Sequence, residues 1–423
     1  HGHLYYAHRG AARMTRAVLH LCQTCRPVTA ENARASLQTA LDAAAARVAQ
    51  LAAAMAKADG TAQARLMETY SQALAERIRA AIGEAGTLPF SHYMEKALYE
   101  PGLGYYSAGL HKLGDTGDFV TAPEIGRLFS ACLALQAEEI GGELEEYEVL
   151  EVGAGTGAFA AGFLGRLSAE TGPRRYRILE RSADLRQVQK ERLTEETPQW
   201  LDRIEWLDQP PTEPWQGLLI ANEVVDALAA ECFAIQGGKV MQCCVSGSGE
   251  GFEWSLTEAP DELETAVRHI EATTGRKFED GYRSELRLHL AEWLDSRTRK
   301  LSRGLALFID YGYERADYYR PDRNTGTLMC HYRHRAHDDP FFWPGLQDIT
   351  VWVDFTAMAE AADRCGLDVA GYASQAFFLV GCGMEPVLQE LMADSEDQGI
   401  ALAAEARQLT LPGMMGEKFK VMG

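Results

Sequence analysis

The 423-residue sequence contains no run of roughly 18 or more apolar residues, so we expect no membrane-spanning helix. Positive charge is also scarce, because 41 lysines and arginines face 61 aspartates and glutamates and leave a formal net charge of -20. This balance argues against sequence-independent nucleic-acid binding, which requires a cationic face. It suits a cationic acceptor such as an arginine-bearing protein, and it also serves solubility alone.

Cysteine is present in an odd number, nine, and no secretory signal opens the sequence. We therefore expect free thiols in a reducing compartment and no disulfide framework. The expected location is a bacterial-type cytoplasm, with the mitochondrial matrix as the alternative, because the first residues lack the Arg-rich and Ser-rich character of a transit peptide. Cys22 and Cys25 form a Cys-x-x-Cys, but no second ligand pair stands at a spacing that suits a metal site.

Alternating strand and helix patterns predict the fold class. Residues 1–66 are rich in alanine and predict a helical extension of unknown role, whereas residues 67–423 predict the main domain. Buried-strand runs are YEVLEV (147–152), YRILER (176–181), LLIANEV (218–224) and GLALFIDYGY (304–313). The rhythm predicts an α/β fold, with a Rossmann-like parallel sheet and helices on both faces. A strand-rich stretch and a polar helical stretch together predict a substrate-side insertion at about 230–300.

A glycine loop, LEVGAGTG, follows the first of these strands. Gly153, Gly155 and Gly157 allow a sharp turn and a close approach of a ligand to the backbone. Gly153, Gly155 and Ala158 also satisfy the dinucleotide pattern G-x-G-x-x-G/A, so an NAD-dependent oxidoreductase is one alternative. Glu151 favours S-adenosylmethionine (SAM), because an acid at this place fixes the methionine ammonium of SAM and gives a pyrophosphate nothing.

Two further groups of polar residues follow strands. Glu180 closes the second strand, where a carboxylate can accept both ribose hydroxyls of SAM or of NAD. Asn222, Glu223 and Asp226 come directly after the apolar run LLIA. In this architecture, residues at that position face the transferable methyl group of SAM. Paired carboxylates can orient a guanidinium, which stays protonated near neutrality, and neutralise its charge. The alternative for Glu223 and Asp226 is that they cap a following helix.

From about Leu88 onward, most of the chain resembles the MidA-like SAM-dependent methyltransferase family. Mitochondrial members of that family are protein arginine methyltransferases that assist the assembly of respiratory complex I. The blocks that carry the resemblance are PFSHYMEKALYEPGLGYYS, GDFVTAPEIGRLF, LEVGAGTG, ILERS, ANEVVDAL, LFIDYGY, GTLMCHYRHRAHDDPFFWPGLQDITVWVDFTAM, SQAFFLVGCG and MGEKFKVM. They occur in one order, which is more specific than any single motif.

The resemblance implies roles for several residues. Gly117 and Asp118 are expected to help hold SAM beside the glycine loop, and the Asn222, Glu223 and Asp226 group is expected to line the acceptor site. The chain departs from the family at Ala229, where proline is usual, and at Gly126, where serine is usual. Neither departure removes a charged group, and both are expected to loosen the substrate-side loop and so to affect the choice of acceptor more than SAM binding.

The histidine-rich segment HYRHRAHDD (331–339) resembles a loop near the active cleft, and the resemblance implies no metal there. His331, His334 and His337 are therefore not expected to be ligands, and methyl transfer to nitrogen needs no Lewis acid. The residues after this segment either build the acceptor pocket or fix the loop, namely Gln347, Asp348, Asp354 and Phe355.

The sequence thus predicts a class I SAM-dependent methyltransferase that acts on an arginine side chain of a protein. A respiratory complex I subunit is one candidate for that protein. The alternatives are a methyltransferase for a small molecule and a non-catalytic assembly factor that keeps the SAM fold. The intact acids Glu151, Glu180 and Glu223 argue against a site that has lost its chemistry.

Overall fold

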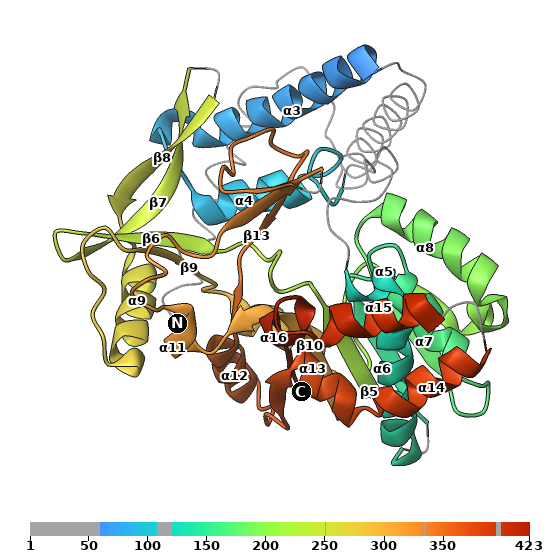
Figure 1. Ribbon diagram of the computed structural model, residues 1–423. Coiled ribbons are helices and arrows are strands. Elements are labelled where there is room, and N and C mark those ends of the chain that lie inside the picture. Colours follow the sequence, from blue (N-terminus) through green and yellow to red (C-terminus); the bar gives the residue numbers. More distant parts are fainter. Residues whose placement is uncertain (1–59, 108–120, 145, 250, 334, 395–398) are drawn as a thin grey trace, which may run out of the picture. The chain divides into compact units, whose positions relative to one another are not determined.

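The computed structural model describes residues 60–107, 121–144, 146–249, 251–333, 335–394 and 399–423 (Figure 1). These residues lie within one compact unit whose bounds are Ala54–Gly423. The predicted features that lie outside the described residues are Gly117, Asp118, His334 and the Cys22–Cys25 pair. In the described part of the chain, no single helix is long and apolar enough to cross a membrane, and one bent helix pair passes by length and composition only.

The first described helix, α3 (Gly60–Ile82), runs across the boundary predicted between residues 1–66 and 67–423. Leu74 and Ile78, one turn apart, are fully buried in the same apolar cluster as helix α4 (Phe90–Tyr99). The C-terminal half of α3 therefore belongs to the core, and the role of the residues before it stays a prediction.

A central sheet has the strand order β15-β16-β10-β5-β2-β3-β4. Its strands are β2 (Glu148–Val152), β3 (Arg175–Leu179), β4 (Ile204–Leu207), β5 (Trp215–Asn222), β10 (Leu301–Tyr313), β15 (Tyr372–Ser374) and β16 (Phe419–Met422). The pairs from β10 to β4 are all parallel, as predicted. Strand β16 lies antiparallel to both of its neighbours, which the sequence patterns did not reveal.

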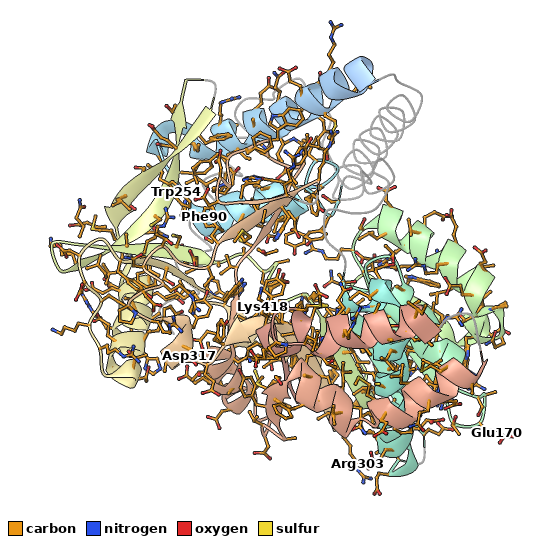
Figure 2. All side chains as sticks on the ribbon, in the orientation of Figure 1. Phe90, Glu170, Trp254, Arg303, Asp317 and Lys418 are labelled. Carbon is orange, nitrogen blue, oxygen red and sulfur yellow. The ribbon has the colours of Figure 1, made fainter. Side chains whose placement is uncertain are left out.

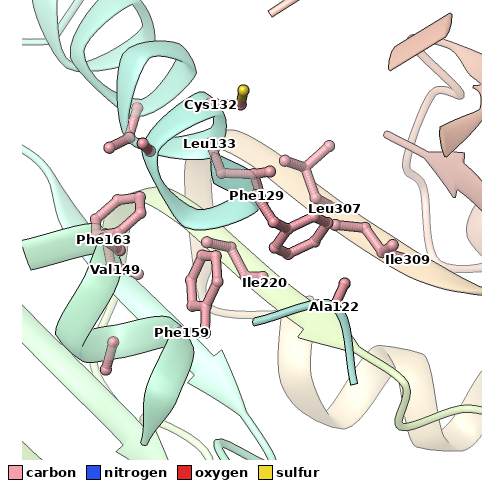
Figure 3. Close-up of a cluster of buried hydrophobic side chains, with 14 of the residues drawn as sticks. Ala122, Phe129, Cys132, Leu133, Val149, Phe159, Phe163, Ile220, Leu307 and Ile309 are labelled. Carbon is pink, nitrogen blue, oxygen red and sulfur yellow. The ribbon is translucent and has the colours of Figure 1, made fainter. Parts of the chain in front are cut away.

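Continuous apolar runs form the central strands because helices cover both faces of the sheet. Val149 and Leu218 lie in one buried cluster with helices of one face, and Leu150 and Leu219 lie in a second cluster with helices of the other. Figure 3 shows Val149 and the side chains around it in the first cluster. The helices concerned are α6 (Leu128–Gly142) and α7 (Ala158–Arg166) for the first cluster, and α10 (Leu290–Thr298) and α12 (Phe355–Arg364) for the second.

A second, antiparallel sheet is formed mainly by the region predicted as a substrate-side insertion. Its strands are β1 (Leu88–Pro89), β6 (Glu231–Gln236), β7 (Lys239–Ser248), β8 (Gly251–Glu258) and β9 (Arg283–Leu286). Helix α4 packs on it, and Phe90 of α4 meets Trp254 of β8 with ring centroids 4.9 Å apart (Figure 2). The polar part of this insertion, residues 260–300, was predicted to be helical. It contains helices α9 (Asp261–Thr274) and α10, but β9 lies between them.

Candidate active site

The glycine loop after β2 has a backbone conformation that favours glycine. Gly153, Gly155 and Gly157 have φ angles of 67°, 53° and 84°, where a side chain strains the backbone. A Cβ atom built on Gly155 would meet no atom within 4 Å, so the space beside this part of the loop is open. The loop therefore combines a tight turn with a backbone that a ligand can approach closely.

The loop also lies at the position where open parallel sheets bind ligands. Strand β2 is the turning point of the sheet, because β3 and β4 follow on one side of it and β5 and β10 on the other. Ligands of such sheets bind beyond the carboxyl ends of the strands at this point. Gly157 is the N-cap of α7, and the free N–H groups of a helix start favour an anionic group.

Glu151 is a buried acid immediately before the loop. Its side chain is 4% exposed, and its Oε2 accepts a hydrogen bond of 2.7 Å from the Tyr176 hydroxyl. Burial raises the pKa of Glu151 to about 7, although the hydrogen bond from Tyr176 acts in the opposite direction. A nearby cation would favour the ionised form of this acid. The geometry thus fits the predicted contact with an ammonium group, which stays a prediction.

Glu180 and the glycine loop are joined by a residue that the sequence did not single out, Gln189 of helix α8 (Ala183–Glu196). The Gln189 amide donates to the Gly155 carbonyl at 2.9 Å and to Glu180 Oε2 at 3.4 Å. Its oxygen accepts from Trp206 Nε1 at 2.9 Å, and its side chain is fully buried. Glu180 Oε1 accepts from the Ser182 N–H, and burial raises the pKa of Glu180. Helix α8 is polar along its length, so no periodic pattern marked Gln189.

The segment after the GDF block is fastened to the glycine loop. Glu124, in helix α5 (Ala122–Ile125), accepts a hydrogen bond from the Thr156 hydroxyl and lies 3.1 Å from Arg192 Nη1 of α8. Arg192 Nη1 also donates to Thr156 Oγ1 at 2.6 Å. These contacts hold α5 against the glycine loop, and α5 begins four residues after the predicted Gly117–Asp118 pair.

Gly126, one of the two departures from the family, leaves space for a carboxylate. A Cβ atom at this position would lie 2.2 Å from Oε2 of Glu405. Glu405, from helix α15 (Gly399–Thr410), is buried and accepts a hydrogen bond of 2.6 Å from the Leu128 N–H at the start of α6. The absence of a side chain at Gly126 therefore lets a distant glutamate cap this helix.

Asn222 and Glu223 lie at the end of β5 beside α5. Glu223 has a φ angle of 53°, which is uncommon for a residue with a side chain, and its N–H donates to the Ile309 carbonyl at 2.8 Å. Its Oε1 accepts from the Ala122 N–H and from Asn222 Nδ2, both at 3.3 Å. Burial, with the charge of Asp226 as the next cause, raises the pKa of Glu223 to about 8.

Asp226 is the most deeply placed of the predicted acceptor residues. It is 4% exposed, and its Oδ2 accepts a hydrogen bond from the Tyr311 hydroxyl. Its Oδ1 is buried and has no hydrogen-bond partner among the described residues, and the same holds for Asn222 Oδ1. Burial raises the pKa of Asp226. Residues 223–230 form turns that lead to β6, so the alternative that these acids cap a following helix is wrong.

Several groups hold the backbone of this acceptor loop, which we define as residues 222–229. The Tyr99 hydroxyl donates to the Ala227 carbonyl at 3.0 Å. The guanidinium of Arg287, after β9, donates to the carbonyls of Asp226 at 2.9 Å and Leu228 at 3.3 Å. These contacts fix the loop in which Ala229 replaces the usual proline.

Four residues after the histidine-rich segment were predicted either to build the acceptor pocket or to fix the loop, namely Gln347, Asp348, Asp354 and Phe355. Of these, Asp348 interacts electrostatically with the acceptor loop. The charge of Asp348 contributes to the raised pKa of Glu223, and Asp348 Oδ1 accepts from the Tyr106 hydroxyl at 3.0 Å. The other three fix structure. Gln347 donates to the Pro340 carbonyl at 2.8 Å, Asp354 caps α12, and Phe355 is buried in the core. Among the described residues, no group of three or more His, Cys, Asp or Glu could hold a metal ion.

The strand order, the glycine loop and its position define the class of the protein, which has the class I fold of SAM-dependent methyltransferases. The chain belongs to the family of S-adenosyl-L-methionine-dependent methyltransferases, because the sequence model of that family matches residues 128–373, more than half of the chain. SAM is therefore its cofactor, and the alternative of an NAD-dependent oxidoreductase is wrong. Open space at Gly155 is compatible with this ligand.

Relatives cover most of the chain. A protein of Burkholderia thailandensis whose crystal structure contains S-adenosyl-homocysteine is 39% identical, with a TM-score of 0.79 over 84% of this chain and 92% of that chain. The protein arginine methyltransferase NDUFAF7 homolog, mitochondrial, of Drosophila melanogaster is 26% identical over 84% of this chain and 85% of its own length. The protein arginine methyltransferase NDUFAF7, mitochondrial, of Rattus norvegicus is 28% identical over 80% of this chain and 81% of its own length.

The position of Glu151 leads to a prediction about SAM affinity. We expect Glu151→Gln to weaken SAM binding by roughly tenfold or more, since a charge-assisted hydrogen bond is lost. Calorimetric titration between pH 6 and 8.5 should show wild-type affinity rising with pH through about 7, the pKa of Glu151, and a flat profile for Glu151→Gln. Equal affinities for the two proteins at pH 8 would show that Glu151 does not contact the ammonium group. Glu191→Gln, on the exposed face of α8, is the control.

Proposed function

We propose that the protein transfers the methyl group of SAM to an arginine side chain of another protein. The observation that supports this most directly is the buried Oδ1 of Asp226, which accepts no hydrogen bond from any described residue and lies close to a second carboxylate with a raised pKa. Among the described residues, no lysine or arginine forms an ion pair with Glu223 or Asp226. A buried carboxylate such as Asp226 that forms no ion pair needs a cation or a proton.

A guanidinium satisfies these groups by shape and by charge. It offers five N–H donors in one plane, and it can donate to Asp226 Oδ1, Asn222 Oδ1 and Glu223 together. Pairing with two acids would neutralise its charge and orient one nitrogen. The nitrogen loses a proton when it gains a methyl group, and a carboxylate of raised pKa is suited to accept that proton. Alignment accounts for much of the rate gain, with proximity able to supply roughly 7–11 kcal/mol at best.

The cofactor side is assigned by the same proposal. SAM supplies an electrophilic methyl group when it is bound. The backbone of Gly153, Gly155 and Gly157 would lie against its carboxypropyl end, with Glu151 toward the ammonium group. Glu180 would accept hydrogen bonds from the ribose hydroxyls. Gln189, which bonds to both Glu180 and Gly155, would hold Glu180 and the glycine loop in fixed positions relative to each other. Gly117 and Asp118 would complete the site.

The choice of a protein acceptor draws support from the relatives, whose names describe them as protein arginine methyltransferases. A respiratory complex I subunit is our candidate acceptor. The relatives are named as mitochondrial proteins, and for this chain we propose a bacterial-type cytoplasm, with the mitochondrial matrix as the alternative. The net charge of -20 favours association with a cationic acceptor.

Isotope-labelled SAM tests the proposal. The protein is incubated with labelled SAM and a complex I-containing lysate, and labelled peptides are mapped by mass spectrometry. We expect label on an arginine, and we expect it to disappear with Glu223→Ala although that variant still binds SAM. Label in a small molecule would establish the other acceptor class. Absence of label in every fraction, with SAM binding intact, would instead indicate a non-catalytic assembly factor.

A further inference from the structure

The last residues of β10 hold the acceptor loop from the side. The Ile309 carbonyl accepts from the N–H of Glu223, the residue with the positive φ angle. One oxygen of Asp310, Oδ2, accepts from the N–H of Val225 at 2.9 Å and of Asp226 at 3.1 Å. Its other oxygen accepts from the Tyr311 N–H at 2.9 Å. The loop is thus shaped by its neighbouring strand, which lies parallel to β5.

Tyr311, next to Asp310, contacts the Asp226 carboxylate of the acceptor loop. Its hydroxyl donates to Oδ2 of Asp226, and its ring packs edge-on against Phe419 with centroids 5.2 Å apart. A carboxylate has two equivalent oxygens and a freely turning end, so a donor on one of them sets the direction of the other. The second oxygen, Oδ1, is buried and has no hydrogen-bond partner within the part of the chain that the structure describes.

We propose that Tyr311 is a positioning residue of the methyl-transfer reaction, whose hydroxyl holds Oδ2 of Asp226 so that Oδ1 faces the acceptor nitrogen. Asp310 assists by fixing the backbone of the same residue. This inference rests on the proposed function, because it assigns Asp226 to the acceptor. It adds a residue that neither touches the acceptor nor binds SAM.

The Tyr311 hydroxyl is important for the ionisation of Asp226, because other acidic groups surround that carboxyl. Acidic groups face Asp226 from several elements, and the Arg287 guanidinium is a cation that lowers the pKa of Asp226. The titratable and charged groups around it are Glu223, Asp310, Tyr311, Arg287, Asp348, Tyr99 and Tyr106. Burial raises the pKa of Asp226, and the Tyr311 hydrogen bond opposes that rise. Loss of the hydroxyl would therefore favour the protonated acid, which binds a guanidinium poorly.

Tyr311→Phe tests this role, because it keeps the ring that packs on Phe419 and removes only the hydroxyl. We expect kcat to fall by roughly tenfold to a hundredfold, as for a lost hydrogen bond to a charged group, with unchanged SAM affinity. The pH profile of kcat/KM should shift to higher pH, since Asp226 then ionises later. A purely structural role would lower stability and leave this profile in place.

Tyr93→Phe is the matched control. Tyr93 is also fully buried, and its hydroxyl donates to the Pro340 carbonyl at 2.7 Å, so its loss affects stability but not the profile. Wild-type kcat and pH profile in Tyr311→Phe would overturn the inference. Asp226→Asn, measured beside it, separates the two proposals. If Asp226→Asn is inactive while Tyr311→Phe behaves as wild type, only the positioning role fails, whereas an active Asp226→Asn removes the proposed acceptor site as well.

Discussion

Asp226→Asn is expected to lower kcat/KM for protein methylation by on the order of 10²–10³, the range seen when a preorganised charge-stabilising group is removed. Asparagine keeps the volume and the hydrogen bond to Tyr311 but leaves an amide where the guanidinium needs a negative charge. SAM affinity should be unchanged, because the proposal assigns Asp226 to the acceptor and gives the SAM contacts to the glycine loop, Glu151 and Glu180.

Methyl transfer from labelled SAM to a purified arginine-containing acceptor measures the effect, and SAM titration of the same preparation serves as the internal check. Asp322→Asn, which removes an exposed carboxylate paired with Arg320, is the control and should retain full activity. Full activity of Asp226→Asn with intact SAM binding would mean that Asp226 does not bind the acceptor guanidinium.

Glu223→Gln should have opposite effects on activity and on stability. In the free wild-type enzyme, kcat/KM should rise with pH up to about 8, because the guanidinium binds the ionised form of Glu223. The variant should lose this ascending limb together with most of its activity. A pH–rate series from 6 to 9.5 tests both points. An unchanged limb in the variant would assign the titration to another group.

The stability effect follows from the direction of the pKa shift. Between the ordinary glutamate pKa and about 8, folded Glu223 holds a proton that the unfolded chain has released. The free energy of unfolding of the wild type therefore falls as pH rises through this window, and it does so less in Glu223→Gln. Urea unfolding at pH 5 and at pH 8.5 should show the variant gaining on the order of 1 kcal/mol at the higher pH only, because Glu223 is partly exposed. An equal difference at both pH values would contradict this.

The sequence predicted the central strands well because their signals are local. Residues 147–152 are mostly apolar and residues 218–221 entirely so, and a strand covered on both faces has that pattern. Strand β9 was missed because three of its four residues, RSEL, are polar and lie inside a polar stretch. The antiparallel β16 is equally short, and its direction depends on pairing with β10 and β15, not on its own residues.

The functional site was predicted only in part, for a similar reason. Residues next to strand ends, such as Glu151 and Glu180, follow from the pattern of strand and turn, although their contacts with SAM remain predictions. Gln189, Tyr99 and Tyr311 act through hydrogen bonds to residues far along the chain, which no periodicity encodes. One signal was present, since Asp310 is a charged residue inside the buried run LFIDYGY, and a buried charge requires partners.

The Gly126–Glu405 contact makes two distant parts of the gene dependent on one another. A serine at position 126 alone would force the Glu405 carboxylate to move from its place beside the Leu128 N–H, and loss of Glu405 alone would leave the start of α6 without its acceptor. Recombination between this chain and a serine-bearing relative would therefore separate matched partners whenever the crossover falls between them. Over evolutionary time, positions 126 and 405 should therefore change together, so that the residue at one position predicts the residue at the other.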